Sequence, residues 1–153
     1  MDNPDIHKIT TYQAGAAQAS MHRLLQKMTD DILVPYGITK MQWMIIGTVF
    51  DSGKQGIRIS DLSISLATTM PYLTTSVNLL ESKGILKRKD NTKDSRSKLV
   101  TVTPHFAPKC REIEEALRNG LRTSIYAKVD PAEFQTYMKV LYQLRDIGKK
   151  QQT

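Results

Sequence analysis

Apolar residues recur at spacings of three and four along most of the chain, a pattern that predicts amphipathic helices. The first stretch with this spacing covers residues 6–34, and Pro35 and Gly37 are expected to end that helix. The same spacing returns over residues 106–148, where Asp130 followed by proline is a strong helix start. Both ends of the chain are therefore expected to be helical.

Between these ends the pattern predicts shorter elements. Thr39 with Gln42 three positions later is typical of a capping box, so a helix is expected to begin there. Residues 56–59 indicate a short strand, and Ser60 is expected to cap a short helix with two inward leucines. The buried face of the helix after Thr39 is expected to carry Trp43, Ile46 and Phe50.

The helix predicted over residues 69–83 has two contrasting faces. Thr69 is its expected N-cap, and Gly84 follows its expected C-cap. With about 100° between successive residues, one face is apolar and carries Leu73, Val77 and Leu80. The opposite face is small, polar and uncharged, with Pro71, Thr75, Asn78 and Ser82. The apolar face is expected to hold the helix on a core, which leaves the polar face outward.

Two strands are predicted directly after this helix. Residues 85–90 and 98–103 flank a polar connection of the kind that joins hairpin strands. A helix, a turn, a second helix and a hairpin make a winged helix-turn-helix pattern. The expected fold is therefore mainly α with a small β-hairpin. It is a single chain over residues 1–153 with a winged helix region over 39–104, and dimerisation helices over 6–34 and 106–148.

The chain is basic, and much of its charge lies on the predicted hairpin. The sequence carries a formal net charge of +7 and has a pI of about 9.5. From Lys87 to Lys98 there are six cationic and two anionic residues, a net charge of +4. A cationic hairpin beside a polar-faced helix favours a nucleic-acid partner, although a lone charged hairpin is more often only a solvated turn.

Other classes of function find little support in the residues. No apolar run is long enough to cross a bilayer and the first residues do not resemble a signal peptide, so we expect a cytoplasmic protein without a membrane partner. His7, His22 and His105 are scattered, without cysteine or carboxylate at ligand spacing. No phosphate-binding loop or nucleophile turn is present. We therefore expect no metal, no cofactor and no enzyme activity.

The only cysteine, Cys110, rules out an internal disulfide framework. It lies between Lys109 and Arg111, which would lower the pKa of its thiol if the thiol were exposed. The simpler interpretation is a small apolar residue of a helix, and no thiol switch is expected.

Three stretches together resemble the MarR family of bacterial transcriptional regulators: "GITKMQWMII", the helix pair from "IRISDLSISLA" to "LLESKGIL", and "RKDNTKDSRSKLVTVTP". The similarity covers roughly residues 30–120 in the same order. It implies a homodimeric transcription factor that binds a pseudo-palindromic operator in double-stranded DNA. We expect a repressor, although the residues do not distinguish repression from activation. It further implies a supporting helix over 60–67, a recognition helix over 69–83 and a wing over 85–103.

The resemblance also assigns residues to DNA binding. On the recognition helix they are Thr69, Pro71, Tyr72, Thr74, Thr75 and Asn78. On the wing they are Arg88, Lys93, Asp94, Arg96 and Lys98. Within this set, Arg96 is the arginine expected in the minor groove and Asp94 the carboxylate expected to orient the wing.

One departure from the family affects the expected operator. The recognition helix has no lysine or arginine between Met70 and Ser82, so this helix lacks the bidentate arginine that reads guanine. Asn78 is able to read adenine, and threonine methyl groups suit the methyl group of thymine. We therefore expect an operator rich in A·T pairs, with much of the affinity from phosphate and wing contacts.

The helices outside the winged region predict assembly and regulation. A winged helix closes its core with about 70 residues, which leaves the amphipathic end helices to pack against a second copy. Removal of residues 124–153 is expected to give a monomer. The resemblance also implies a small amphipathic or phenolic effector near Tyr36, Trp43 and Met44, although each of these three is more often a core residue.

A second class of function stays open at this stage. The uncharged outer face of residues 69–83 also fits a basic winged module that binds RNA or a protein partner without an operator of its own. Competition of one specific duplex against bulk DNA and RNA would discriminate between the two.

Overall fold

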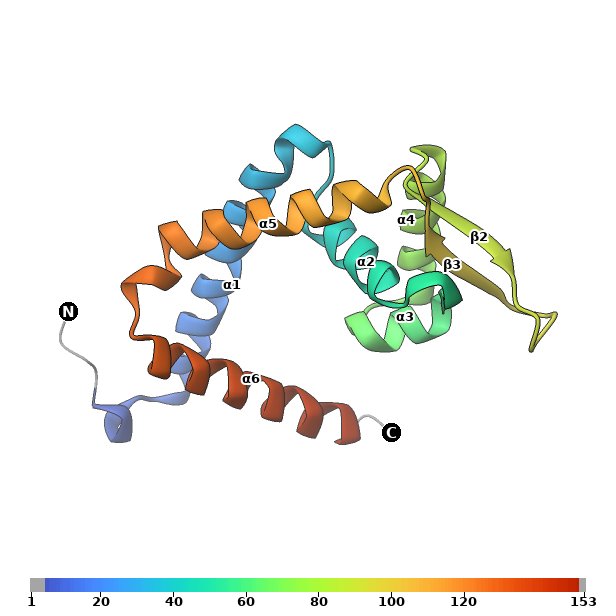
Figure 1. Cartoon of the computed structure of the whole chain (residues 1–153). Helices are drawn as coiled ribbons and strands as arrows, with labels where there is room; N and C mark the ends of the chain where they lie inside the picture. Colours follow the sequence, from blue (N-terminus) through green and yellow to red (C-terminus); the bar gives the residue numbers. More distant parts are fainter. Residues whose placement is uncertain (1–4, 152–153) are drawn as a thin grey trace. The chain divides into compact units, whose positions relative to one another are not determined.

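A computed structural model describes residues 5–151 of the chain and shows a mainly helical protein with one small sheet (Figure 1). The α-helices are α1 (Thr11–Leu33), α2 (Lys40–Asp51), α3 (Ile59–Leu66), α4 (Met70–Ser82), α5 (Ala107–Ser124) and α6 (Pro131–Gln151). The strands are β1 (Ile57–Arg58), β2 (Leu86–Asp90) and β3 (Lys98–Val102). Short 3-10 turns are η1 (Ile6–Lys8), η2 (Val34–Tyr36), η3 (Gly53–Gln55) and η4 (Tyr126–Lys128). The chain divides into two compact units, Met1–Glu115 and Ala116–Thr153.

Capping explains where the first two long helices begin. The Thr10 hydroxyl accepts from the backbone N–H of Gln13, and the Gln13 side chain accepts from the backbone N–H of Thr10. The same reciprocal pair joins Thr39 and Gln42, as the sequence predicted. The expectation of one helix over 6–34 was wrong at both ends, because η1 and η2 are separate turns outside α1.

The core of the first unit forms where α2, α3 and α4 meet the sheet. α2 packs on α3 and β3, and α4 packs on α3 and β2. The fully buried side chains of these elements are Ile45, Ile46, Val49, Leu62, Leu73, Val77, Leu80, Leu86 and Val100. Trp43 and Phe50 are only half-buried, so the predicted buried face of α2 was wrong in two of its three residues. α2 has partners on two sides, which turns the isoleucine pair and Val49 inward.

The sheet is antiparallel with the strand order β1–β3–β2. Ile57 pairs with Val100 in β3, and Leu86 pairs with Val102. The short strand expected near residues 56–59 is therefore confirmed. The predicted Ser60 cap was wrong, because β1 runs directly into α3 and Arg58 occupies the N-cap position.

Gly56 allows the turn before β1 to lie directly on β3. Its φ and ψ are 79° and 176°, a conformation that is almost restricted to glycine. A Cβ atom at this position would lie 2.8 Å from the Val100 carbonyl oxygen and 2.8 Å from Cγ2 of Thr101. Backbone conformation and close approach thus both require glycine here.

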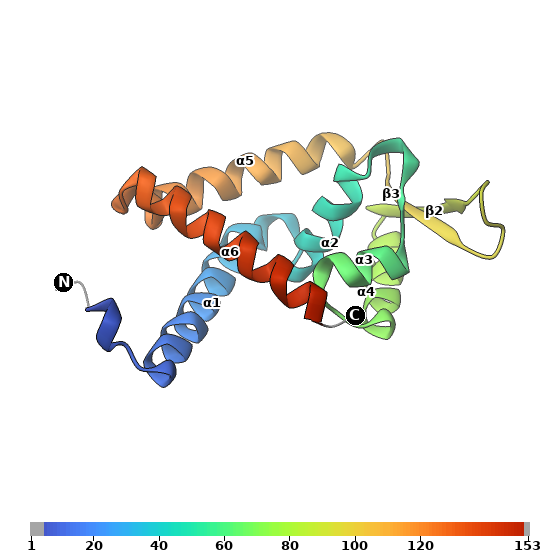
Figure 2. The same cartoon turned by 90° about the horizontal axis from the view of Figure 1, so that it is seen from below.

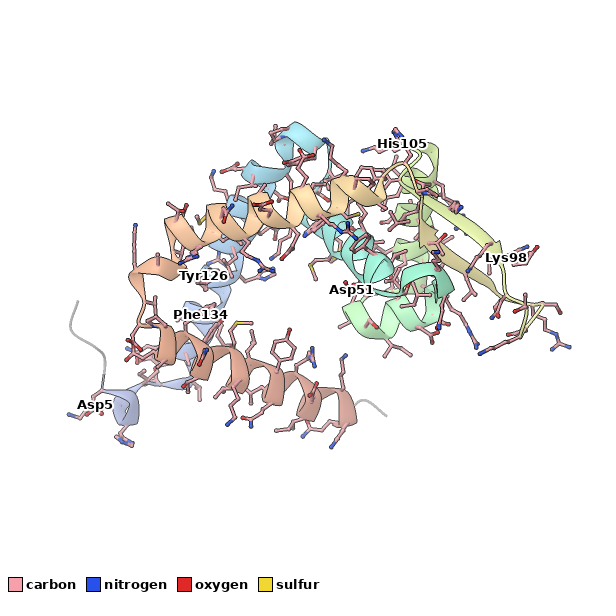
Figure 3. All side chains as sticks on the ribbon, viewed as in Figure 1. Asp5, Asp51, Lys98, His105, Tyr126 and Phe134 are labelled. Atoms are coloured by element: carbon pink, nitrogen blue, oxygen red, sulfur yellow. The ribbon has the colours of Figure 1, made fainter. Side chains whose placement is uncertain are left out.

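The second unit contains the end of α5, η4 and α6. The rings of Tyr126 and Phe134 face each other across the turn, with their centroids 4.5 Å apart (Figure 3). The Asp130 carboxylate accepts from the backbone N–H groups of Ala132 and Glu133, which confirms the predicted helix start. α6 continues to Gln151, beyond the end expected at residue 148, and has no buried residue. No helix among residues 5–151 is both long enough and apolar enough to cross a membrane.

The role of Gly56 predicts an asymmetric response to alanine. Gly56→Ala should lower the free energy of unfolding by about 3 kcal/mol or more, because strain and overlap with β3 add. Gly37→Ala is the matched control, since Gly37 also has a positive φ but open space around it. The control should lose only about 1 kcal/mol. Equal losses in urea unfolding would refute the proposed contact with β3.

Candidate nucleic-acid interface

The outer face of α4 is exposed, as the sequence predicted. Leu73, Val77 and Leu80 are fully buried, while Pro71, Thr74, Thr75, Asn78 and Ser82 are exposed. The hydroxyl of Thr74 donates to the Met70 carbonyl at 2.9 Å, and that of Thr75 donates to the Pro71 carbonyl at 3.1 Å. These hydroxyl protons are used within the helix. The threonines therefore offer methyl groups and oxygen lone pairs to a partner, which fits thymine methyl groups.

The other residues predicted for this helix lie at its N-cap, on its flank and just after its C-cap. Thr69 is the N-cap residue, but its side chain makes no capping hydrogen bond. Tyr72 lies on the flank of the helix with 44% of its surface exposed. Gly84 follows the C-cap with φ of 71°, as expected of a glycine at that position.

Arg88 brings a cation from β2 to the outer face of α4. Its guanidinium donates to Oδ1 of Asn78 at 2.8 Å and forms a salt bridge with Glu81. The side chains of Arg88 and Glu81 are both about one quarter exposed, at 27% and 26%. Because arginine only donates, the atom of Asn78 that faces it is the oxygen, which leaves the two N–H donors of that amide for another partner.

The loop between β2 and β3 is organised by its own side chains. Asp94 accepts from the backbone N–H of Arg96 at 3.1 Å and lies 3.9 Å from the guanidinium of Arg58. The amide of Asn91, which is 7% exposed, donates to the Ser97 hydroxyl and accepts from the backbone N–H of Lys93. The loop therefore holds a defined shape even though most of its residues are exposed.

The cations of this loop extend beyond the helical body. In both views the β2–β3 hairpin projects past α2, α3 and α4 (Figures 1 and 2). Lys93 and Arg96 are exposed and form no salt bridge with any described residue. Lys98 pairs with Asp90 across the strands, and this ion pair lowers the pKa of the Asp90 carboxyl group. The two cations at the tip, Lys93 and Arg96, therefore have no carboxylate partner among the described residues.

Three residues of this arrangement escaped the sequence analysis. Glu81 forms a salt bridge with Arg88, and Arg58 forms one with Asp94. The amide of Asn91 closes the loop by its hydrogen bond to Ser97. Asn91 carried a usable signal, because asparagine beside threonine at a hairpin end favours an Asx turn. The ion pairs of Arg88 with Glu81 and of Arg58 with Asp94 left no signal in the sequence, because they depend on how β1 and α4 pack against the hairpin.

The residues suggested for an effector pocket lie in η2 and at the start of α2. Tyr36 and Trp43 are half-buried, and Met44 is 37% exposed. The ammonium group of Lys109 lies 5.8 Å from the centroid of the Tyr36 ring, which is a cation–π contact between α5 and η2.

Cys110 is buried in the first unit. Its side chain is 2% exposed, and burial raises the pKa of the thiol to about 11. Its charged neighbours therefore do not activate it, because desolvation disfavours the thiolate. Among residues 5–151, no group of three or more histidine, cysteine or acidic residues is placed to hold a metal ion.

Comparison with solved structures identifies the fold, whereas no family model matches the chain. AbsC from Streptomyces coelicolor, a MarR family transcriptional regulator, aligns with a TM-score of 0.78 at 19% identity, over 93% of this chain and 97% of AbsC. A mutant of MarR from E. coli bound to operator DNA aligns with a TM-score of 0.77 at 22% identity, over 85% and 91%. CouR from Rhodococcus jostii bound to p-coumaroyl-CoA aligns with a TM-score of 0.79 at 12% identity, over 90% and 95%. The chain therefore has the winged helix fold of MarR family regulators.

Burial of Cys110 predicts slow alkylation of the native protein. With the pKa raised from 9.0 to about 11, the thiolate fraction at pH 8 falls roughly 100-fold, and limited access slows the reaction further. Iodoacetamide should label the native protein at least roughly 100-fold more slowly than the same protein in guanidinium chloride, followed by mass spectrometry. Similar labelling rates in the two states would contradict the buried thiol.

Proposed function

We propose that this protein is a sequence-specific DNA-binding transcriptional regulator, a repressor that acts as a homodimer on a pseudo-palindromic operator. The observation that carries the proposal is the pairing of an outward, uncharged polar face on α4 with a cationic hairpin tip beside it. The first fits the edges of bases in the major groove, and the second fits the minor groove and its phosphates. The fold shared with MarR bound to operator DNA supports this assignment.

In this proposal α4 enters the major groove. Thr74 and Thr75 present methyl groups toward thymine, which favours A·T pairs. Asn78 keeps its amide donors, and Arg88 holds the amide in one orientation through the oxygen. Donors alone suit adenine N7 or thymine O4 but equally guanine N7 and O6, so with Arg88 on its oxygen Asn78 does not select A·T pairs, and that preference rests on the threonine methyl groups.

The hairpin tip supplies much of the affinity. Arg96 lies exposed, and the carboxylate of Asp94 holds the backbone at this residue. A guanidinium on a preorganised loop loses less conformational freedom when it enters a narrow minor groove. Lys93 and Lys98 add positive charge next to it, and their contribution should depend on salt concentration.

The apolar face of α6 supports assembly into a dimer. Its large apolar residues remain substantially exposed in the single chain: Tyr137, Val140, Leu141, Tyr142, Leu144 and Ile147. On α1, Tyr12 and Leu24 are also exposed, at 74% and 47%. A soluble monomer rarely leaves an apolar helix face such as that of Tyr137, Leu141 and Leu144 in water. A second copy would bury these faces and set two α4 helices about 34 Å apart, one turn of duplex.

A small amphipathic effector belongs to the proposal as well. CouR, which shares the fold, was solved with p-coumaroyl-CoA bound. A ligand that binds more tightly to a dimer whose two α4 helices are wrongly spaced for the duplex would lower the fraction of dimers that can bind DNA. Tyr36, Trp43 and Met44 are the residues we propose for such a site.

The alternative function is a basic module that binds RNA or a protein partner without an operator. The absence of lysine and arginine from α4 keeps this alternative open. Competition distinguishes the two, because an operator duplex must outcompete bulk DNA and RNA by a factor of about a thousand or more if the protein is sequence-specific.

The tip arginine provides the sharpest mutational test of the wing. Arg96→Ala should weaken binding to every duplex by about tenfold or more, because a charge-assisted contact is lost on all sequences. Lys128→Ala is the matched control, since it also removes one exposed cation but lies outside the proposed interface. If both variants bound duplex equally well in fluorescence anisotropy, the wing assignment would be wrong.

The exposed face of α6 predicts the effect of charge on assembly. Leu144→Glu with Ile147→Glu should convert the dimer to a monomer and weaken operator binding, because carboxylates would have to be buried between the copies. These residues are 60% and 55% exposed, so the single chain should keep its helical content. Lys139→Glu with Lys149→Glu is the control on the same helix. A double variant that stays dimeric in analytical ultracentrifugation would place the interface elsewhere.

A further inference from the structure

Glu81 is the only charged residue of α4. The sequence of this helix contains no lysine, arginine, histidine or aspartate, so its one charge is negative. A carboxylate on a helix that enters the major groove would be repelled by the phosphates on either side. The side chain of Glu81 is only 26% exposed and forms a salt bridge with Arg88, which neutralises it. Glu81 is thus suited to hold Arg88 and not to contact DNA itself.

The guanidinium of Arg88 joins two residues of α4. Asn78 and Glu81 are three positions apart, so their side chains are neighbours on the helix surface. Arg88 donates through Nη1 to Glu81 and through Nη2 to Oδ1 of Asn78, the latter at 2.8 Å. On β2, Arg88 lies on the same strand face as the buried Leu86, two residues earlier, and β2 packs on α4. The strand thus directs the side chain toward α4, and the two contacts together fix the orientation of the guanidinium.

This arrangement decides which groups of the Asn78 amide face a partner. Asn78 is exposed, and its carbonyl oxygen is directed toward Arg88, so its N–H donors point away from that residue. A free asparagine amide binds adenine in a bidentate manner, with an N–H group donating to N7 and the oxygen accepting from N6. With the oxygen held, only the donors remain for a base. In the major groove guanine offers two acceptors, adenine and thymine offer one each, and cytosine offers only a donor.

We propose that Glu81 is a positioning residue for base recognition, and that it acts through Arg88. The ion pair holds the Asn78 amide with its donors toward the duplex, which excludes cytosine at the position that Asn78 contacts. The threonine methyl groups favour A·T pairs at their own positions of the half-site. The ion pair also keeps the Arg88 cation away from the phosphates. This role rests on the proposed function, because it needs a duplex at the outer face of α4.

The test is fluorescence anisotropy of the full chain on four duplexes that differ only in the base contacted by Asn78. The parent duplex comes from selection on a randomised library, and the position is the one whose preference is lost in Asn78→Ala. The unaltered protein should bind guanine at this position about fivefold or more tightly than cytosine. Glu81→Arg with Arg88→Glu keeps the ion pair and the net charge, but its new carboxylate accepts from the amide N–H and turns the amide oxygen outward. This variant should prefer cytosine over guanine by a similar factor.

Two single variants test the same role if the exchanged pair disturbs folding. Arg88→Met removes the cation but keeps an unbranched side chain, so the amide is freed and adenine should become the preferred base by about fivefold or more. Glu81→Gln releases the guanidinium toward the phosphates, so affinity for bulk DNA should rise. The logarithm of that affinity should also fall more steeply with the logarithm of salt concentration, by about 0.9 for each copy of α4. Glu112→Gln is the matched control, because it removes a carboxylate from an ion pair with Lys109 on α5, and it should change neither base preference nor salt dependence.

A preference for guanine that survives the exchange of Glu81 and Arg88 would overturn the proposal, because an ion pair that only stabilises the fold predicts that result. Equal salt dependence of Glu81→Gln and Glu112→Gln would overturn it as well. In both cases the unaltered protein still discriminates among duplexes, so the role of Glu81 is lost while the proposed function stands. If the unaltered protein binds every duplex alike, the proposed function fails and the role of Glu81 fails with it.

Discussion

The burial of one face of α4 is the constraint on which the proposed interface depends. Leu73, Val77 and Leu80 have no exposed surface, and burial of each such side chain contributes about 1.5–3 kcal/mol. A helix fixed in this way can rotate only at the cost of that burial, so its small polar residues must face outward. The groups offered to a partner are thus set by the core behind them. They include threonine methyls and the amide of Asn78.

The hairpin is tied to the same helix through a single side chain. Arg88 reaches from β2 to Glu81 and Asn78, which couples the orientation of the strand to that of the outer face of α4. Further along, Asp94 and Asn91 hold the loop that carries the free cations. The positions of α4 and of the hairpin are therefore interdependent.

Local signals in the sequence predicted the elements well, and tertiary packing accounts for the errors. The Thr39–Gln42 capping pair, Gly84, the apolar face of α4 and the two hairpin strands all follow from short-range chemistry, and the structure confirms them. The buried face of α2 was misassigned, because its packing against both α3 and β3 decides which residues turn inward. Ser60 looked like a cap, but β1 runs into α3 without a turn.

The proposed function requires two copies of one winged helix, with α4 and the hairpin tip of each copy bound to the same duplex. The measurement that tests it most directly is selection of the full-length protein on a randomised duplex library, followed by sequencing. We predict an enriched inverted repeat with A·T-rich half-sites whose centres are about one helical turn apart. A selected pool without a repeat, or one no different from the starting library, would contradict it.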